Sequence, residues 1–178
     1  MDDQLVEKKP GAALPPQGAG MMPPQSVIHS TFVIRKRYPK PVAKVFAAFA
    51  DPAKKRRWYA EREPNAVDVF EMDFRVGGRA LLQYRLGAST PFPGAIIINT
   101  AHFVDIVPDS RIVEASTMAF GERRFSAALI TVEFLESANG CELVFTHQGA
   151  FFEGSDGPEL REKGWQHLLA GLDGEVLG

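Results

Sequence analysis

Near its carboxy terminus the chain reads ELREKGWQHLLAGLDGEVL, residues 159–177. Apolar side chains recur there with the spacing i, i+3, i+4, i+7 and i+11, which is typical of one face of an α-helix. This stripe consists of Trp165, Leu168, Leu169, Leu172 and Val176. The glycines of the same stretch, Gly164, Gly171 and Gly174, each disfavour a helix by up to about 1 kcal/mol. We therefore expect one amphipathic helix that depends on packing of its apolar stripe against the rest of the fold.

The sequence before this helix has the two-residue period of β-strands. Phe70, Met72 and Phe74 would share one face of the first such strand. Further strand-like runs extend over residues 80–86, 95–107, 111–118, 123–135 and 141–148. The glycine pair within Val76–Arg79 predicts a tight hairpin, because paired glycines supply the positive φ angles of two-residue turns. Consecutive strands with such short connections indicate an antiparallel meander.

The amino-terminal part of the chain has three predicted features. Residues 1–30 contain many prolines and glycines and almost no aromatic side chains, so we expect a flexible tail there and a single domain over residues 31–178. Alternation over residues 31–38 predicts a strand. The apolar spacing that follows predicts a helix of about three turns, and Asp51-Pro52 is a start signal for a second, shorter helix.

Composition limits the classes of protein to which the chain can belong. Of its 178 residues, 45% are hydrophobic and 10% are aromatic, which is enough apolar material for the core of one domain. The net charge of −2 gives no global reason to expect nucleic acid or an anionic membrane as partner. The single cysteine, Cys141, cannot crosslink the chain, and neither a membrane-spanning run nor a signal segment is evident. We therefore expect a cytoplasmic protein that does not insert into membranes.

This order of elements predicts an α+β fold in which one curved antiparallel sheet of six or seven strands wraps around the long last helix. The order and several local motifs resemble the helix-grip (START-like) superfamily. Within it, the chain is most similar to the family of the activator of heat-shock-protein-90 ATPase. The motifs that carry this resemblance are Trp58, Asp73–Arg79 (DFRVGGR), Val104–Arg111 (VDIVPDSR), Thr131–Phe134 (TVEF), Leu143–His147 (LVFTH) with Gly149 and Phe151, and Gly164-Trp165.

The resemblance implies a cavity between the sheet and the last helix. We therefore expect a small-molecule binding protein that holds an apolar or amphipathic ligand there. The residues predicted to border the ligand are Phe74, Tyr84, Phe125, His147, Trp165 and Leu169. Tyr84 and His147 would supply directional hydrogen bonds, and the others would supply apolar surface. His147 would point inward with Leu143 and Phe145 of the same strand, where the plainer interpretation is a hydrogen-bonded core histidine.

A second hypothesis is an interaction module of the chaperone-cofactor type. Between residues 35 and 62, ten Lys and Arg stand against Asp51 and Glu61, which gives a local net charge of +8. A basic face could attract an acidic protein surface. The residues assigned to this face are Lys54, Lys55, Arg56 and Arg57. A solvated helix face is the plainer interpretation of such a charge run.

A third hypothesis is a cyclase- or hydrolase-like enzyme. It would need an inward acid–base pair such as His147 with Tyr84 or His147 with His102. The sequence contains no nucleophile elbow and no dinucleotide-binding loop, and its His, Cys and carboxylate residues do not have the local spacing of metal ligands. We therefore expect no metal, no cofactor and no nucleic-acid partner. The sequence identifies neither the ligand nor the oligomeric state.

Overall fold

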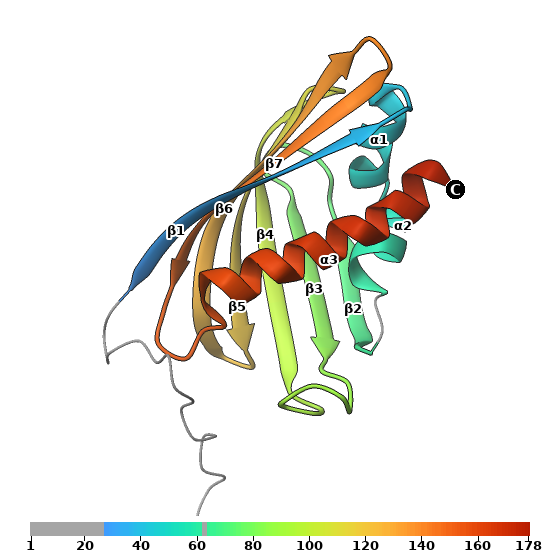
Figure 1. Ribbon diagram of the computed structural model, residues 1–178. Coiled ribbons are helices and arrows are strands. Elements are labelled where there is room, and N and C mark those ends of the chain that lie inside the picture. The colour runs from blue at the N-terminus through green and yellow to red at the C-terminus, as the bar shows by residue number, and fades with distance from the viewer. Residues whose placement is uncertain (1–26, 62–63) are drawn as a thin grey trace, which may run out of the picture.

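The structure is a computed structural model that describes residues 27–61 and 64–178. Seven strands form one antiparallel sheet in the order β1-β7-β6-β5-β4-β3-β2, and helix α3 lies across one face of it (Figure 1). The strands are β1 (Ile28–Tyr38), β2 (Ala66–Met72), β3 (Arg79–Arg85), β4 (Ile96–Val107), β5 (Arg111–Phe120), β6 (Arg123–Ser137) and β7 (Gly140–Phe151). The helices are α1 (Val42–Ala50), α2 (Pro52–Lys55), the π-helical turn η1 (Arg56–Ala60) and α3 (Gly157–Leu177). The predicted α+β helix-grip fold is confirmed.

The first strand of the chain lies beside the last one. β1 pairs with β7 along its whole length, and β2 to β7 follow one another as the predicted meander. β1 begins three residues before the expected start at Thr31, so His29 belongs to the sheet although the sequence placed it in the tail. Residues 1–26 of that tail lie outside the described residues.

The predicted two-residue hairpin at the glycine pair is wrong. β2 ends at Met72 and β3 begins at Arg79, so a longer connection joins them. Glycine is required at the two positions of this connection for different physical reasons. Gly77 adopts a φ of 79°, which side-chain-bearing residues rarely adopt. Gly78 lacks the positive φ, but a Cβ there would collide with the backbone carbonyl oxygen of Asp73.

The predicted start of the second helix is confirmed by its cap. The carboxylate of Asp51 accepts hydrogen bonds from the backbone N–H groups of Ala53 (2.8 Å) and Lys54 (3.2 Å), which α2 itself cannot satisfy. Further along, the buried indole of Trp58 donates its Nε1–H to the carbonyl oxygen of Ala48 at 2.7 Å. This bond ties η1 to α1, so η1 has a fixed position beside the last helix.

Helix α3 packs on the sheet through the predicted apolar stripe. Leu169, Leu172 and Val176 are completely buried. The ammonium of Lys36 in β1 donates hydrogen bonds to the carbonyl oxygen of Leu169 (2.9 Å) and to the carboxylate of Asp173 (2.6 Å). The carboxy-terminal half of α3 is therefore anchored to β1 by apolar packing and by charge. Among the described residues, no helix is long and apolar enough to cross a membrane.

Gly149 in β7 offers a test of this packing. A Cβ at this position would lie 2.8 Å from Cε1 of His147 and 2.8 Å from Cε2 of Phe151, and both rings are buried. We expect Gly149→Ala to lower the free energy of unfolding by about 1–3 kcal/mol because the overpacked rings must shift. Gly174→Ala is the matched control, since a Cβ there meets nothing within 4 Å. It should stabilise α3 by up to about 1 kcal/mol. Urea denaturation measures both changes, and equal effects of the two variants would contradict this packing.

Candidate functional site

A cavity of about 200 Å³ lies between the sheet and the amino-terminal half of α3. Strands β3 to β7 form one wall, and η1 and α3 form the others. The apolar side chains that line it include Ala60, Leu82, Met118, Ile130, Trp165 and Leu168. An apolar cavity of about 150 Å³ can hold one benzene molecule. The space between sheet and helix therefore suits a single ring with a small substituent.

The mouth of the cavity lies beside the first turns of α3. The lining residues Asp156, Leu160 and Gly164 are exposed to solvent there, and Leu160 has 61% of its surface exposed. The opposite, inner end of the cavity is closed by buried side chains such as Ile130 and His147. A ligand that enters beside α3 would thus lose most of its contact with water.

Polar groups interrupt the apolar wall at several points. They include the side chains of Tyr59, Tyr84, Asn99, Ser116, His147 and Arg161. The amide Nδ2 of Asn99 donates a hydrogen bond to the hydroxyl oxygen of Tyr59 at 3.0 Å, and the ring of Tyr59 stacks on that of Trp165 with centroids 5.8 Å apart. Burial raises the pKa of Tyr84 to about 12, so its hydroxyl stays protonated and can donate a hydrogen bond.

His147 is the most deeply buried polar residue of the cavity wall. It points inward as predicted, with only 1% of its surface exposed, and its ring stacks on Phe32 with centroids 4.7 Å apart. Its Nδ1 atom has no hydrogen-bond partner among the described residues, so it differs from a satisfied core histidine. Burial, and then the charge of Arg161, lower the pKa of His147 to about 4. The imidazole is therefore neutral at pH 7.

Arg161 is the only positively charged residue among the described residues that line the cavity, and it forms an ion pair at the start of α3. Arg161 donates from Nε and Nη2 to the two carboxylate oxygens of Asp156 at 2.8 and 2.7 Å, and from Nη2 to the hydroxyl of Ser126 in β6 at 3.0 Å. Its guanidinium lies 5.3 Å from the ring centroid of Phe151. Sequence reasoning missed Arg161. The available signal was its position four residues before Trp165, on the same helix face as the apolar stripe.

The structure brings together three of the six residues predicted to border a ligand. Tyr84, His147 and Trp165 line the cavity. Phe125 lies behind the wall, with its ring centroid 5.9 Å from the guanidinium carbon of Arg161.

The other two predicted residues lie elsewhere in the core. Leu169 is completely buried, one turn beyond Trp165 on α3. Phe74 follows the end of β2 and packs edge-on against Phe103 at 5.1 Å. Neither residue is among those that line the cavity.

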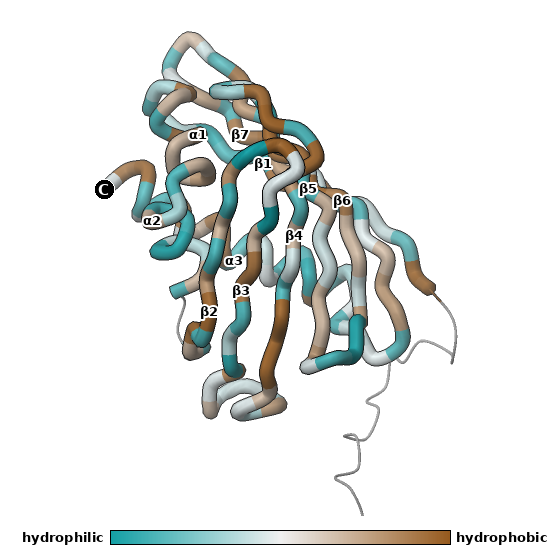
Figure 2. The backbone as a smooth tube through the Cα atoms, turned by 180° about the vertical axis from the view of Figure 1, so that it is seen from behind, coloured by the Kyte–Doolittle hydropathy of each residue, from teal (hydrophilic) through white to brown (hydrophobic). Residues whose placement is uncertain are grey.

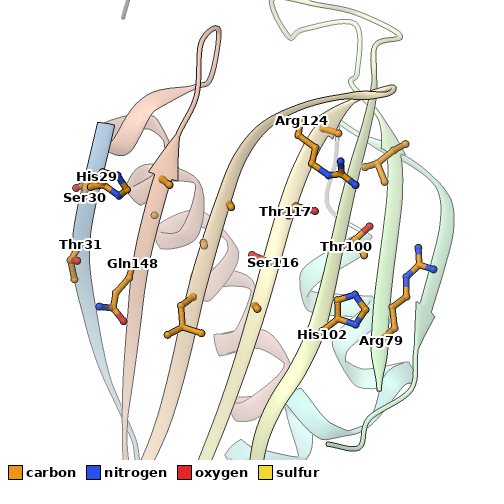
Figure 3. A pocket seen from close by; sticks show the side chains of 18 of the residues that line it. His29, Ser30, Thr31, Arg79, Thr100, His102, Ser116, Thr117, Arg124 and Gln148 are labelled. Atoms are coloured by element: carbon orange, nitrogen blue, oxygen red, sulfur yellow. The ribbon is translucent and has the colours of Figure 1, made fainter. Parts of the chain in front are cut away.

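The opposite face of the sheet, which Figure 2 views from behind, carries a broad, open hollow of about 1220 Å³, and Figure 3 shows side chains that line it. His102 lies in this hollow, where the strand register sets it between Arg79 and Ala115. His102 and His147 therefore face opposite sides of the sheet and cannot form the acid–base pair considered for an enzyme. Enclosed sites bury most of a ligand's surface, so the helix-side cavity is the better candidate site.

The four residues assigned to a basic face do not share one exposed surface. Lys55 is only 7% exposed, and its ammonium lies 3.8 Å from the carboxylate of Glu114. Arg56 and Arg57 also pair with carboxylates, and Arg57 reaches Glu175 of α3 at 2.7 Å. Three of the four positive charges are thus neutralised within the described part of the chain.

Known families and solved structures agree with this architecture. The family described as Activator of Hsp90 ATPase homolog 1-like protein matches residues 39–176. An uncharacterized protein from Rhizobium leguminosarum is 35% identical, with a TM-score of 0.77 over 85% of this chain and 96% of that chain. Mll3558 protein from Rhizobium loti is 43% identical, with a TM-score of 0.76 over 85% of this chain and 100% of that chain.

A more distant structure shows the fold alone. The AHSA1-like protein from Aeromonas hydrophila is 21% identical, with a TM-score of 0.62 over 83% of this chain and 92% of that chain. No curated protein matches the chain. The family match nevertheless spans α1 to α3 and includes every wall of the cavity. The chain therefore belongs to the family of Activator of Hsp90 ATPase homolog 1-like proteins.

Proposed function

We propose that the protein binds a small apolar or amphipathic molecule, of about one ring, in the cavity between the sheet and α3. The observation that carries this proposal is a largely apolar cavity whose wall includes His147, a buried residue with a partnerless Nδ1 among the described residues. Buried polar atoms without a partner are rare in proteins and cost stability. A site that keeps such an atom beside a cavity is consistent with a ligand that fills the cavity.

The size of the cavity determines the affinity that we expect for a one-ring ligand. A single aromatic ring buries about 150 Å², which is worth about 4 kcal/mol at about 25 cal/mol per Å². Apolar contact alone therefore gives a dissociation constant of about 1 mM. Hydrogen bonds to wall residues such as Tyr84 would tighten binding by about 1 kcal/mol each.

Two other functions receive less support from the structure. Docking of a chaperone through Lys54–Arg57 would require an exposed basic face, whereas Lys55 is buried and Arg56 and Arg57 are paired with carboxylates. An enzyme of the cyclase or hydrolase type would need two reactive groups on one side of the sheet, and of the two partners considered for His147, Tyr84 lines the cavity and His102 does not. We therefore propose ligand binding as the primary function.

A pair of small-to-large substitutions distinguishes ligand binding in the helix-side cavity from ligand binding in the hollow on the opposite face of the sheet. Ala60→Leu adds three carbon atoms inside the helix-side cavity, whereas Ala115→Leu adds them on the exposed outer face. We expect Ala60→Leu to weaken the binding of one-ring aromatic probes by about ten-fold or more, because it occupies the space of the ligand. Ala115→Leu should leave binding unchanged. Titrations followed by two-dimensional NMR measure both affinities, with melting temperatures to show that each variant is folded. Loss of binding in Ala115→Leu alone would place the ligand on the outer face.

The buried imidazole predicts a specific pH dependence of stability. The folded chain protonates His147 only near pH 4, whereas the unfolded chain does so near pH 6.5. Its contribution to stability is therefore complete above pH 6.5 and is lost as the pH falls toward 4. The loss amounts to roughly 3 kcal/mol at about 1.4 kcal/mol per pKa unit. His147→Gln should remove this part of the pH dependence, and the control His102→Gln should retain it. Denaturant unfolding at pH 4 to 7 decides between these outcomes, and parallel curves for both variants would contradict a neutral, buried His147.

A further inference from the structure

The charges on the cavity wall balance each other. Among the described residues that line the cavity, Arg161 and Asp156 carry the formal charges at neutral pH, and they form a two-pronged ion pair with contacts of 2.8 and 2.7 Å. The side chain of Arg161 is only 8% exposed, and that of Asp156 is 32% exposed at the mouth. Asp156 thus holds the position that the carboxylate of an acidic ligand would otherwise take.

The same arginine still has hydrogen-bond donors to offer. All of its hydrogen bonds to described residues leave from Nε and Nη2. The two N–H groups of Nη1 are therefore available, and a guanidinium in a protein neither loses its proton nor accepts a hydrogen bond. A ligand that places an acceptor oxygen at Nη1 would satisfy these donors without changing the charge of the site.

A ligand with its own charge would fit this wall poorly. An anion would bring a second carboxylate to a guanidinium that Asp156 already neutralises, and a cation would meet a carboxylate that Arg161 already neutralises. Placing an uncompensated charge in a buried site costs several kcal/mol. The neutral imidazole of His147 offers no counter-charge to either ligand.

We propose that Asp156 sets the charge selectivity of the cavity, so that the site takes an uncharged one-ring ligand with a hydrogen-bond acceptor such as a carbonyl oxygen, and excludes anions. This inference rests on the proposed function, because it assigns the chemical class of the ligand in the same cavity. Arg161 acts in it as the donor to the ligand. Asp156 acts as a specificity-determining residue that occupies the anionic position itself.

Four probes of similar size test the inference: acetophenone, ethylbenzene, benzoate and benzylammonium. With the full chain at pH 7, we expect acetophenone to bind about ten-fold or more tightly than benzoate and benzylammonium, because only the ions bring an uncompensated charge. Acetophenone should also bind about three-fold or more tightly than ethylbenzene, which lacks the acceptor. Chemical-shift titrations of isotope-labelled protein measure the four affinities.

Removal of the carboxylate charge should reverse the selectivity. In Asp156→Asn the charge of Arg161 is uncompensated, so benzoate should bind about ten-fold or more tightly than it binds the wild type. The matched control is Asp105→Asn, since Asp105 also accepts from Nε and Nη2 of an arginine, Arg111, but through one oxygen and at an exposed site. It should leave all four affinities unchanged. If Asp156→Asn does not fold, Arg161→Met provides the second variant, and it should reduce the preference for acetophenone over ethylbenzene while ethylbenzene still binds.

The possible failures of this experiment are distinguishable. If the wild type binds benzoate as tightly as acetophenone, or if Asp156→Asn gains no affinity for benzoate, Asp156 does not set the selectivity, while the proposed binding function stands. If acetophenone retains its full advantage over ethylbenzene in Arg161→Met, the donor role of Arg161 is wrong. If none of the four probes binds to the folded wild type, the proposed function fails together with this inference.

Discussion

The contact between one long helix and a bent sheet is the constraint on which the rest of the structure depends. The carboxy-terminal half of α3 packs without a gap, because Leu169, Leu172 and Val176 are completely buried and Lys36 of β1 bonds to this part of the helix. The amino-terminal half stands off from the sheet, and the helix residues that line the cavity all lie between positions 160 and 168. One half of α3 thus supplies stability, and the other half leaves the cavity.

The open half of the helix still needs a fixed position, and polar contacts provide it. Arg161 donates a hydrogen bond to the hydroxyl of Ser126 in β6 at 3.0 Å. This bond ties the first turns of α3 to the sheet and leaves the cavity between them open. On the opposite side, Trp58 holds η1 against α1, which places Tyr59 against Trp165. These contacts hold α3 and η1 in fixed positions, so the cavity between them and the sheet can stay open.

Much of the fold, and about half of the candidate site, follows from sequence patterns. The period of two in the strands and the stripe ending at Val176 predicted the sheet and the helix that packs on it. The pattern could not place Phe74, because it continues past the end of β2 into the connection after that strand. Partners distant in sequence could not be predicted either: the charge run gave no sign that Arg57 pairs with Glu175 of α3. Arg161 escaped notice because charged residues are seldom expected on a buried helix face.

The central claim is that α3 leaves a ligand-sized space on its own side of the sheet. Intermolecular nuclear Overhauser effects between bound acetophenone and the protein test it most directly, because they report which protons of the protein lie close to the ligand. The account predicts contacts from the ring to the methyl group of Met118 and to the indole of Trp165. Contacts to Ala115 or Thr117 instead would place the ligand in the outer hollow and contradict the account.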